Sequence, residues 1–572
     1  MAVSLHDKQL PTPGGRSPYT TAPDTHSLTS PVSSKASSTS TLVEETSQSK
    51  VPQLSTCKLF FAHLGAAMTL FLATTDATIV STILPSIAGQ YNASQLEYTW
   101  VGVAYMLTQT ALQPLYGKLS DLVGRKFVLY ASMAIFVAGS LCCGCAQSML
   151  WLIIARGFAG VGGGGIVSLV WTITSEIVDA ESRAAWSQAL SVTWSCSAIA
   201  GPLLGGVFSV YLNLPVCLLA FGVIFISLHG IQVGCKTQTI SWKKFGNTFD
   251  FLGLLLFMSG SSCVVVGFSF ASTLGWRNPL TLVLIIGGPV VLIIGGFYET
   301  HTRRAALFPR PAFTDLTTII ILLINLLHNF AFNAGTYYLA LYFQTVGGLS
   351  PLKSGVSMLP YSLGSSIASV PVAWFISYWQ KQRCDISAQK YAISLGLAIS
   401  ALGFGLMKTM DGYTARALQV IFPLCAGVGL GMLFHAPYQV FLSALKPLEM
   451  ASGTSAFFLV RFTGATVGLA VAGTAFDARL STQLPKELGS SFDLNQLKSI
   501  MPLELRVQIS QAVASSIQTI WLICAPCLTL AFVISIFVRT RVQVQRPTEE
   551  EAQEKEAKLP ALQNSVIGET VA

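Results

Sequence analysis

The feature that most constrains this chain is a succession of apolar runs, each about twenty residues long. A helix of that length crosses the hydrocarbon core of a bilayer and satisfies its own backbone hydrogen bonds there. The chain is 52% hydrophobic and 10% charged, whereas about a quarter of a soluble domain is charged. The sequence therefore predicts an all-α polytopic membrane protein with about fourteen transmembrane helices. The runs lie at 59–84, 99–116, 127–147, 150–175, 186–209, 214–233, 250–272, 280–298, 316–339, 354–378, 390–408, 416–436, 453–475 and 517–538.

The charges between the runs predict the orientation. An even number of spans places both tails, 1–56 and 541–572, on one side of the membrane. Loops on that side carry roughly 17 Lys and Arg, against about 7 on the other side, and such an excess marks the cytoplasmic side. We therefore expect cytoplasmic, disordered tails, the first of them rich in Ser, Thr and Pro. The net charge of +8 is explained by these loops, so no nucleic-acid partner is expected.

Two features are expected on the external side. Asn92 begins an Asn-Ala-Ser sequon in the first external loop and is a candidate glycosylation site. The connection 476–516 is the longest external loop, and its length leaves room for a helix lying in the membrane surface.

A charged decapeptide, 117–126, separates the second and third apolar runs and is expected to turn the chain between them. Gly117 and Gly124 allow a close backbone approach or a positive φ. Asp121 can cap a helix or pair with a cation, while Arg125 and Lys126 hold the loop on the cytoplasmic side. An ordinary basic loop would explain the two cations but not the glycines with an acid between them.

Ionisable residues inside the apolar runs are candidates for function, because a charge in the bilayer is costly unless it faces the protein interior. Asp76 lies in the first run, where burial makes reversible protonation feasible. Its alternative role is structural, through a hydrogen bond to Thr74, Thr75 or a neighbouring helix. Arg156 begins a glycine-rich stretch in the fourth run that suits tight helix packing; the alternative is that it snorkels to water. Three settings are open for Arg461 in the thirteenth run: it pairs with a carboxylate, it faces the cargo cavity, or it snorkels to water at the membrane surface.

The decapeptide resembles the loop between helices 2 and 3 of the major facilitator superfamily. The sequence around Asp76 resembles the first-helix signature of its fourteen-helix drug:proton antiporters, among them fungal drug and toxin efflux pumps. A Gly-Pro-x-x-Gly-Gly stretch resembles their antiporter signature; its proline kinks the helix and its glycines allow close packing. That stretch contains Gly201, Pro202, Gly205 and Gly206.

The resemblance implies an architecture and roles for residues. It implies an N-terminal six-helix bundle at 57–235, a linker with two inserted transmembrane helices at 236–315, and a C-terminal six-helix bundle at 316–540. Asp121 and Arg125 would belong to a cytoplasmic latch, which also takes in the flanking glycines and Lys126. Arg156 would take part in proton coupling with Asp76, and cargo would bind between the halves near the bilayer midplane.

Polar and aromatic residues on several runs are candidates for the cargo cavity, because such groups suit amphipathic organic molecules. Packing between helices is the plainer explanation for any one of them. The candidates are Tyr105, Gln109, Trp194, Asn333, Tyr337, Gln439 and Arg461.

The function expected is a proton-coupled antiporter that exports drugs, toxins or secondary metabolites by alternating access. It would be powered by the proton gradient without a cofactor or metal, and it would act as a monomer in the plasma membrane rather than the vacuolar membrane. One alternative is a vacuolar or plasma-membrane carrier of basic amino acids or siderophores on the same fold. A non-transporting nutrient sensor is less expected, because the tails are short and of low complexity. No enzyme activity is expected, since no catalytic motif or phosphate loop occurs.

Overall fold

The computed structural model describes most of the chain between residues 56 and 539. The described residues are 56–91, 93, 95–178, 186–187, 189–194, 196–197, 200–201, 222, 246, 249–302, 304, 307–308, 311–383, 385–445, 449–483 and 503–539. Of the predicted features, Asn92, Pro202, Gly205, Gly206 and the two tails lie outside these residues, as does most of the predicted pair of spans at 186–233.

The N-terminal part of the described chain consists of helices with short connections. A break at Leu112 separates α2 from α3, because Pro114 in the first turn of α3 has no backbone N–H and restricts the residue before it. Ser148 caps α5, its hydroxyl accepting a hydrogen bond from the Trp151 backbone N–H. The helices are α1 (Thr56–Gln90), α2 (Gln95–Ala111), α3 (Gln113–Val123), α4 (Arg125–Gly144) and α5 (Met149–Ile177).

The remaining helices follow the largely undescribed stretch up to residue 249. Asp250 and Asp315 cap α9 and α12, each carboxylate accepting a backbone N–H of the first turn. The helices are α9 (Phe251–Thr273), α10 (Pro279–His301), α11 (Pro311–Thr314), α12 (Leu316–Thr345), α13 (Pro351–Ser357), α14 (Leu359–Arg383), α15 (Ser387–Met407), α16 (Arg416–Met432), α17 (Ala436–Ser443), α18 (Met450–Gln483) and α19 (Leu503–Ser535).

The all-α polytopic architecture agrees with the prediction. In the described part of the chain, 11 helical stretches are long and apolar enough to cross a membrane. The predicted span 99–116 is divided between α2 and α3. The connection predicted at 476–516 is shorter than expected, because α18 continues to Gln483 and α19 begins at Leu503.

The decapeptide is not the loop that the sequence predicted. Residues 117–123 are helical and complete α3, and Arg125 already begins α4. The chain turns at Gly124 alone, which has φ = 103°. This conformation is easy for glycine and strained for other residues, so one glycine replaces a longer loop.

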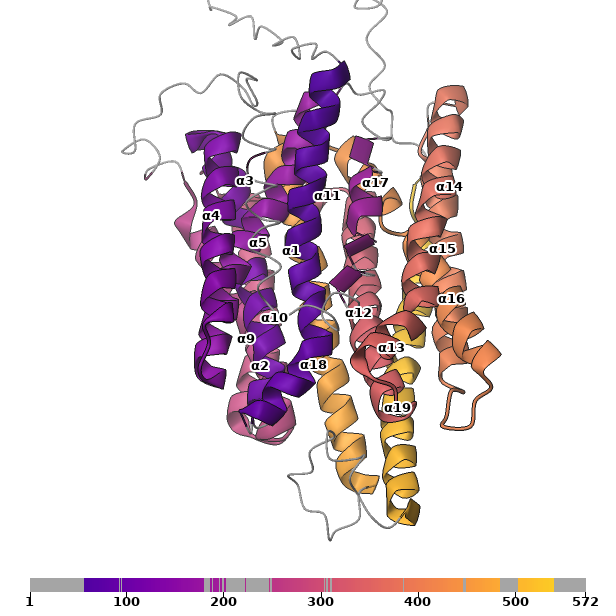
Figure 1. Ribbon diagram of the computed structural model, residues 1–572. Coiled ribbons are helices and arrows are strands. Elements are labelled where there is room, and N and C mark those ends of the chain that lie inside the picture. The colour runs from indigo at the N-terminus through magenta and orange to yellow at the C-terminus, as the bar shows by residue number, and fades with distance from the viewer. Residues whose placement is uncertain are drawn as a thin grey trace, which may run out of the picture. The chain divides into compact units, whose positions relative to one another are not determined.

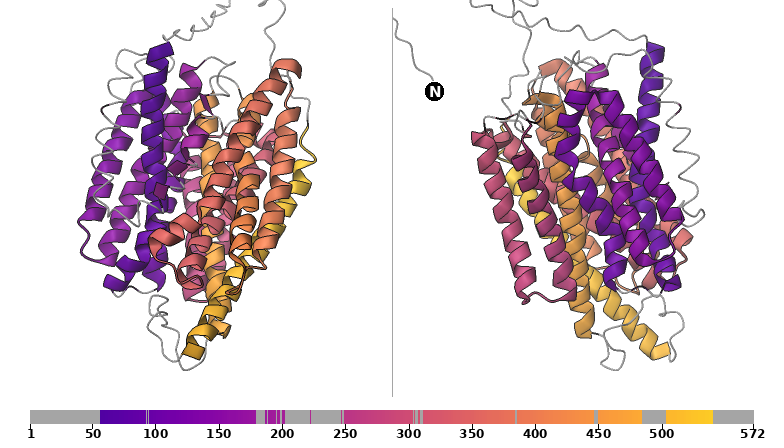
Figure 2. Two further views of the ribbon diagram at one scale, coloured as in Figure 1. Left: turned by 45° about the vertical axis from the view of Figure 1, so that its right-hand side comes forward. Right: turned by 90° about the vertical axis from the view of Figure 1, so that its left-hand side faces the viewer.

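The helix pair predicted as an insertion, α9 and α10, packs on helices from both the N-terminal half (α1 to α5) and the C-terminal half (α12 to α19) of the described chain. α9 and α10 pack against each other, and α9 also contacts α2 and α18 (Figure 2). The outer face of α10 is apolar and exposed, with Val283 66%, Ile286 62% and Phe297 69% accessible. Such a face is suited to lipid, as expected for a helix at the edge of a membrane protein.

The two halves meet along α18 (Figure 1), which contacts α2, α3 and α5 of the N-terminal half as well as α12 and α19 of its own half. On the other side, α1 contacts α12 and α13. The elements that line the middle of the molecule are therefore α1, α2 and α5 from one half, and α12 and α18 from the other. The candidate sites lie on these helices.

Candidate functional site

A buried ion pair joins α1 to α5. Arg156 Nη1 lies 2.5 Å from Asp76 Oδ2, and the two side chains are 4% and 6% exposed. Arg156 Nη2 also donates to the Asp76 backbone carbonyl at 3.4 Å. Arg156 therefore points into the protein and does not snorkel to water. The Thr74 hydroxyl donates to the Leu70 carbonyl at 2.7 Å, so it stays within its own helix.

Tyr105 completes this group from α2. Its ring lies under the Arg156 guanidinium, with Cζ 4.3 Å from the ring centroid, and its hydroxyl donates to the Ala73 carbonyl on α1 at 3.0 Å. A cation over an aromatic face is stabilised by the ring quadrupole. Tyr105, which the sequence suggested as a cargo residue, thus holds helices α1, α2 and α5 together.

The glycine-rich stretch of α5 makes room for this group. A Cβ at Gly160 would overlap the Tyr105 carbonyl, and a Cβ at Gly163 would overlap the Tyr105 hydroxyl. On the other face of α5, a Cβ at Gly162 would overlap the backbone of α4 at Phe136. Small residues at such positions let helices in a membrane approach closely. The predicted tight packing is present, and it is α2 and α4 that pack there.

A small cavity of about 60 Å³ lies between the halves beside the ion pair. Pockets for drug-sized ligands have volumes of about 300–1,000 Å³, so the halves must separate to admit such a molecule. Five of the predicted cargo residues line the cavity, while Tyr105 and Gln439 do not. The lining residues are Ala73, Thr74, Ala77, Thr78, Met106, Gln109, Trp194, Ser197, Asn329, Phe332, Asn333, Thr336, Tyr337, Arg461, Phe462 and Ala465.

A polar ladder on α12 joins the predicted Asn333 to Asn325 and Asn329, which were missed from the sequence. Asn329 Nδ2 donates to the Asn325 carbonyl at 2.8 Å, and Asn333 Nδ2 donates to the Asn329 carbonyl at 3.1 Å. Asn329 and Asn333 face the cavity, and Arg461 Nε donates to Asn329 Oδ1 at 3.1 Å. The signal was available, because three amides at intervals of four residues in an apolar run predict one polar helix face.

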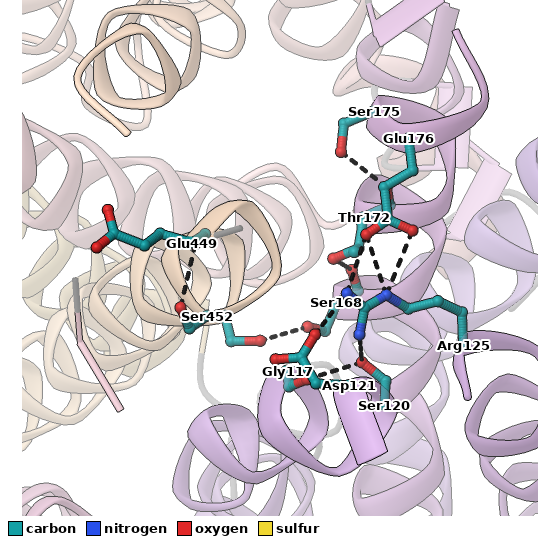
Figure 3. Close-up of polar contacts among 11 residues, drawn as sticks. Gly117, Ser120, Asp121, Arg125, Ser168, Thr172, Ser175, Glu176, Glu449 and Ser452 are labelled. Carbon is teal, nitrogen blue, oxygen red and sulfur yellow. Dashed lines mark hydrogen bonds and ion pairs between the residues drawn. The ribbon is translucent and has the colours of Figure 1, made fainter. Parts of the chain in front are cut away.

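Two of the predicted latch residues, Asp121 and Arg125, form an ion pair (Figure 3). Arg125 Nη2 lies 2.5 Å from Asp121 Oδ1 and 2.9 Å from Glu176 Oε1, and Nη1 donates to the Ser120 hydroxyl at 2.8 Å. Glu176, at the end of α5, was not predicted; it is an acid close to the end of an apolar run, where a carboxylate is unremarkable. Lys126 is the second residue of α4 and is half-buried.

The halves are in close contact at this end of the molecule. The hydroxyls of Ser168 on α5 and Ser455 on α18 are 2.8 Å apart. A Cβ at Gly117 would lie 2.9 Å from the Ala451 carbonyl oxygen, so only glycine lets α3 rest on α18 here. Gly117 and Gly124 thus serve the two purposes that the sequence left open, a close approach at one and a positive φ at the other.

The described part of the antiporter motif contacts the helix of Asp76. A Cβ at Gly201 would overlap the Thr78 hydroxyl on α1, two residues beyond Asp76. The Thr78 hydroxyl donates to the Ser197 carbonyl at 3.4 Å, and both residues line the cavity. Gly201 therefore packs directly against the wall that carries the candidate proton site.

Comparison with known proteins gives consistent matches. A model of the Major Facilitator Superfamily matches residues 66–469. An MFS-type transporter of Schizosaccharomyces pombe is 31% identical over 510 residues, which cover 87% of this chain and 84% of the relative. Efflux pump dotC of Dothistroma septosporum is 29% identical over 80% of each chain. The crystal structure of a bacterial homologue of the human lysosomal transporter Spinster, inward-facing and occupied, is similar in fold, with a TM-score of 0.55 at 15% identity over 86% of this chain and 100% of that one.

Proposed function

Because the chain belongs to the Major Facilitator Superfamily of transporters, we propose that it exports organic compounds across a membrane in exchange for protons. The observation that carries the proposal is the buried pair of Asp76 and Arg156 beside a cavity between the two halves. A carboxylate in that position can take up and release a proton, and helices α1 and α2 connect it to the cavity wall.

Protonation of Asp76 supplies the driving force for the conformational change. It removes the negative charge and leaves the Arg156 guanidinium buried without a countercharge. Removing one partner of a buried ion pair costs roughly 3–5 kcal/mol, and each 1.4 kcal/mol changes a conformational equilibrium about tenfold. One proton can therefore shift the balance between two arrangements of the halves by about two to three and a half orders of magnitude, enough to reverse a ratio of about 1:10 to 10:1.

The closed end of the molecule acts as the cytoplasmic gate. Arg125 holds Asp121 at the end of α3 and Glu176 at the end of α5, and α3 and α5 both rest on α18. The latch keeps the ends of α3 and α5 in the positions in which they contact α18. Opening this end to load cargo requires α18 to leave α3 and α5, so the latch favours the closed arrangement. Export rather than uptake is supported by the relative described as efflux pump dotC and by the Gly-Pro-x-x-Gly-Gly motif.

The remaining features of the proposal are a plasma-membrane location, cytoplasmic termini, a functional monomer, no cofactor and no enzyme activity. A carrier of basic amino acids fits the cavity less well. Its described lining contains the cation Arg461 and no Asp or Glu, so a cationic cargo would meet a like charge.

The test is transport by the purified full-length protein in vesicles whose interior is one pH unit more acidic than the outside. The probes are rhodamine 6G, a cation, and 2-naphthalenesulfonate, an anion that crosses bilayers poorly. We expect at least one probe to accumulate inside as protons leave, and the accumulation to vanish when the gradient is dissipated. Equal transport with and without the gradient would show that the protein is not proton-coupled.

A further inference from the structure

The cavity contains a buried cation that has no acidic partner in the described part of the chain. Arg461, in the first half of α18, is 3% exposed and lines the cavity. Its Nε donates to Asn329 Oδ1, while Nη2 has no hydrogen-bond acceptor. A buried guanidinium normally has an acidic partner or a full set of acceptors. Arg461 therefore retains an unused donor beside the cavity.

Acidic residues are scarce in the undescribed part of the N-terminal half, where Asp179 and Glu181 directly follow the end of α5. Residues 182–249 contain no Asp or Glu at all. Arg156 provides the contrast, because it is equally buried but lies 2.5 Å from Asp76. With Asp76 ionised, that pair is neutral and Arg461 leaves a net positive charge at the cavity.

Aromatic rings surround the guanidinium without supplying an acceptor. Arg461 Cζ lies 4.4 Å from the ring centroid of Trp194, 5.3 Å from Phe434 and 5.7 Å from Phe458. These faces stabilise a cation but cannot accept its N–H groups as a carboxylate does. They also exclude water and keep the guanidinium plane fixed, which favours two parallel hydrogen bonds to an oxyanion.

We propose that Arg461 is the anion-binding residue of the cargo site and that the cargo is an aromatic organic acid, carrying one carboxylate or sulfonate group. The oxyanion would accept from the guanidinium, and the second hydrogen of Asn333 Nδ2 would supply a further donor, while Asn329 orients Arg461 through its Oδ1. The ring of the cargo would pack on Trp194 and Phe462, which lie nearly parallel with centroids 6.2 Å apart. This assignment rests on the proposed function and names the chemical class of its cargo.

The test is equilibrium binding to purified full-length protein in lipid nanodiscs, with no pH gradient. The probes are 2-naphthalenesulfonate and the neutral 2-naphthalenesulfonamide, which share the ring and the sulfonyl group. For the native protein we expect the anion to bind about tenfold tighter or more, the difference between a charge-assisted and a neutral hydrogen bond. Equal affinities, or no binding of the anion, would overturn the assignment.

Three variants separate recognition from folding. Arg461→Gln should lose the preference for the anion while still binding the sulfonamide, and Arg461→Lys should keep a reduced preference, because it retains the charge but not the fork. Arg479→Gln, on an exposed arginine of the same helix, should behave as the native protein. Survival of the full preference in Arg461→Gln would refute the proposal. If Arg461→Gln does not fold, an undiminished preference in Arg461→Lys refutes it instead.

The outcome is independent of the transport test. A protein that binds the sulfonate anion in preference to the sulfonamide but moves no probe against a pH gradient would refute the proposed antiport and leave the assignment of Arg461 intact. A protein that exports rhodamine 6G with a pH gradient but does not distinguish the sulfonate from the sulfonamide would support the proposed antiport and refute the assignment of Arg461.

Discussion

Asp76→Asn tests the proton site directly, because asparagine keeps the size of the side chain and removes only its titratable charge. The loss of one partner from a buried pair costs about 3–5 kcal/mol when nothing replaces it. In the native protein Arg156 Nη1 lies 2.5 Å from Asp76 Oδ2, and the asparagine oxygen of the variant can still accept that hydrogen bond. We therefore expect the loss of folding free energy to lie near the lower end of this range. The variant should therefore fold and insert, with its defect confined to coupling.

The size of that defect follows from one carboxylate carrying one proton. A gradient of one pH unit is worth about 1.36 kcal/mol per proton, which corresponds to a concentration ratio of about ten. With the membrane potential clamped at zero, the native protein should accumulate cargo about tenfold for each pH unit. In Asp76→Asn the ratio should stay at about one at every gradient, because no proton exchanges against cargo.

Counterflow distinguishes a coupling defect from a general loss of transport. It exchanges labelled for unlabelled cargo without net proton movement, so it should continue in Asp76→Asn at saturating cargo. The assay uses vesicles with matched protein content and whichever probe the native protein moves. In Asp121→Asn, which weakens the gate and leaves the proton site intact, accumulation and counterflow should slow together. Equal loss of counterflow in the two variants would mean that their roles are wrongly assigned.

Two further predictions concern the scaffold. Glu176→Gln should shift the free energy between the closed and open gate by about 1–2 kcal/mol, and Asp121→Asn by less than about 1 kcal/mol. The reason is burial, because the Glu176 side chain is 21% exposed and that of Asp121 is 33% exposed. Deuterium uptake at the start of α18 measures this opening. Gly162→Ala should lower the melting temperature and the yield, because its methyl group would overlap the α4 backbone, whereas Gly287→Ala, with open space around it, should behave as the native protein. Equal melting temperatures in these two variants would contradict the packing argument.

The sequence was sufficient to predict most of the fold, because the cost of an unsatisfied backbone in lipid makes each apolar run a helix. It also indicated Asp76, Arg156 and Arg461 as candidate functional residues, because a charge inside an apolar run is costly unless it faces the protein interior and has a polar partner there. Their partners could not be predicted. Asp76 and Arg156 are 80 residues apart, and which faces of α1 and α5 meet is decided by packing between helices.

The sequence was least informative where a residue's environment depends on several helices. Tyr105 resembled a cargo residue because it is aromatic and polar, yet the glycines of α5 place it against Arg156. Glu176 was overlooked because an acid at the end of a span is inexpensive there, and only the fold brings it to Arg125. The decapeptide was assigned to a loop from its charges, although its apolar and polar residues also suit two helix ends joined at Gly124.

An anionic cargo makes the sign of the coupling between the two sites measurable. Through space, neutralising Asp76 adds positive charge near the cavity and should strengthen anion binding, which would favour co-transport of proton and anion. Exchange requires the opposite, that the protonated state binds cargo more weakly. The structure offers a route, because Ala73, Thr74 and Thr78 of α1 line the cavity on either side of Asp76 along the helix. Rearrangement around the released Arg156 would therefore displace that wall. We expect Asp76→Asn to bind 2-naphthalenesulfonate at least about fivefold more weakly, the lower end of allosteric coupling. Tighter binding in the nanodisc assay would mean that direct electrostatics prevail and that proton and cargo travel together.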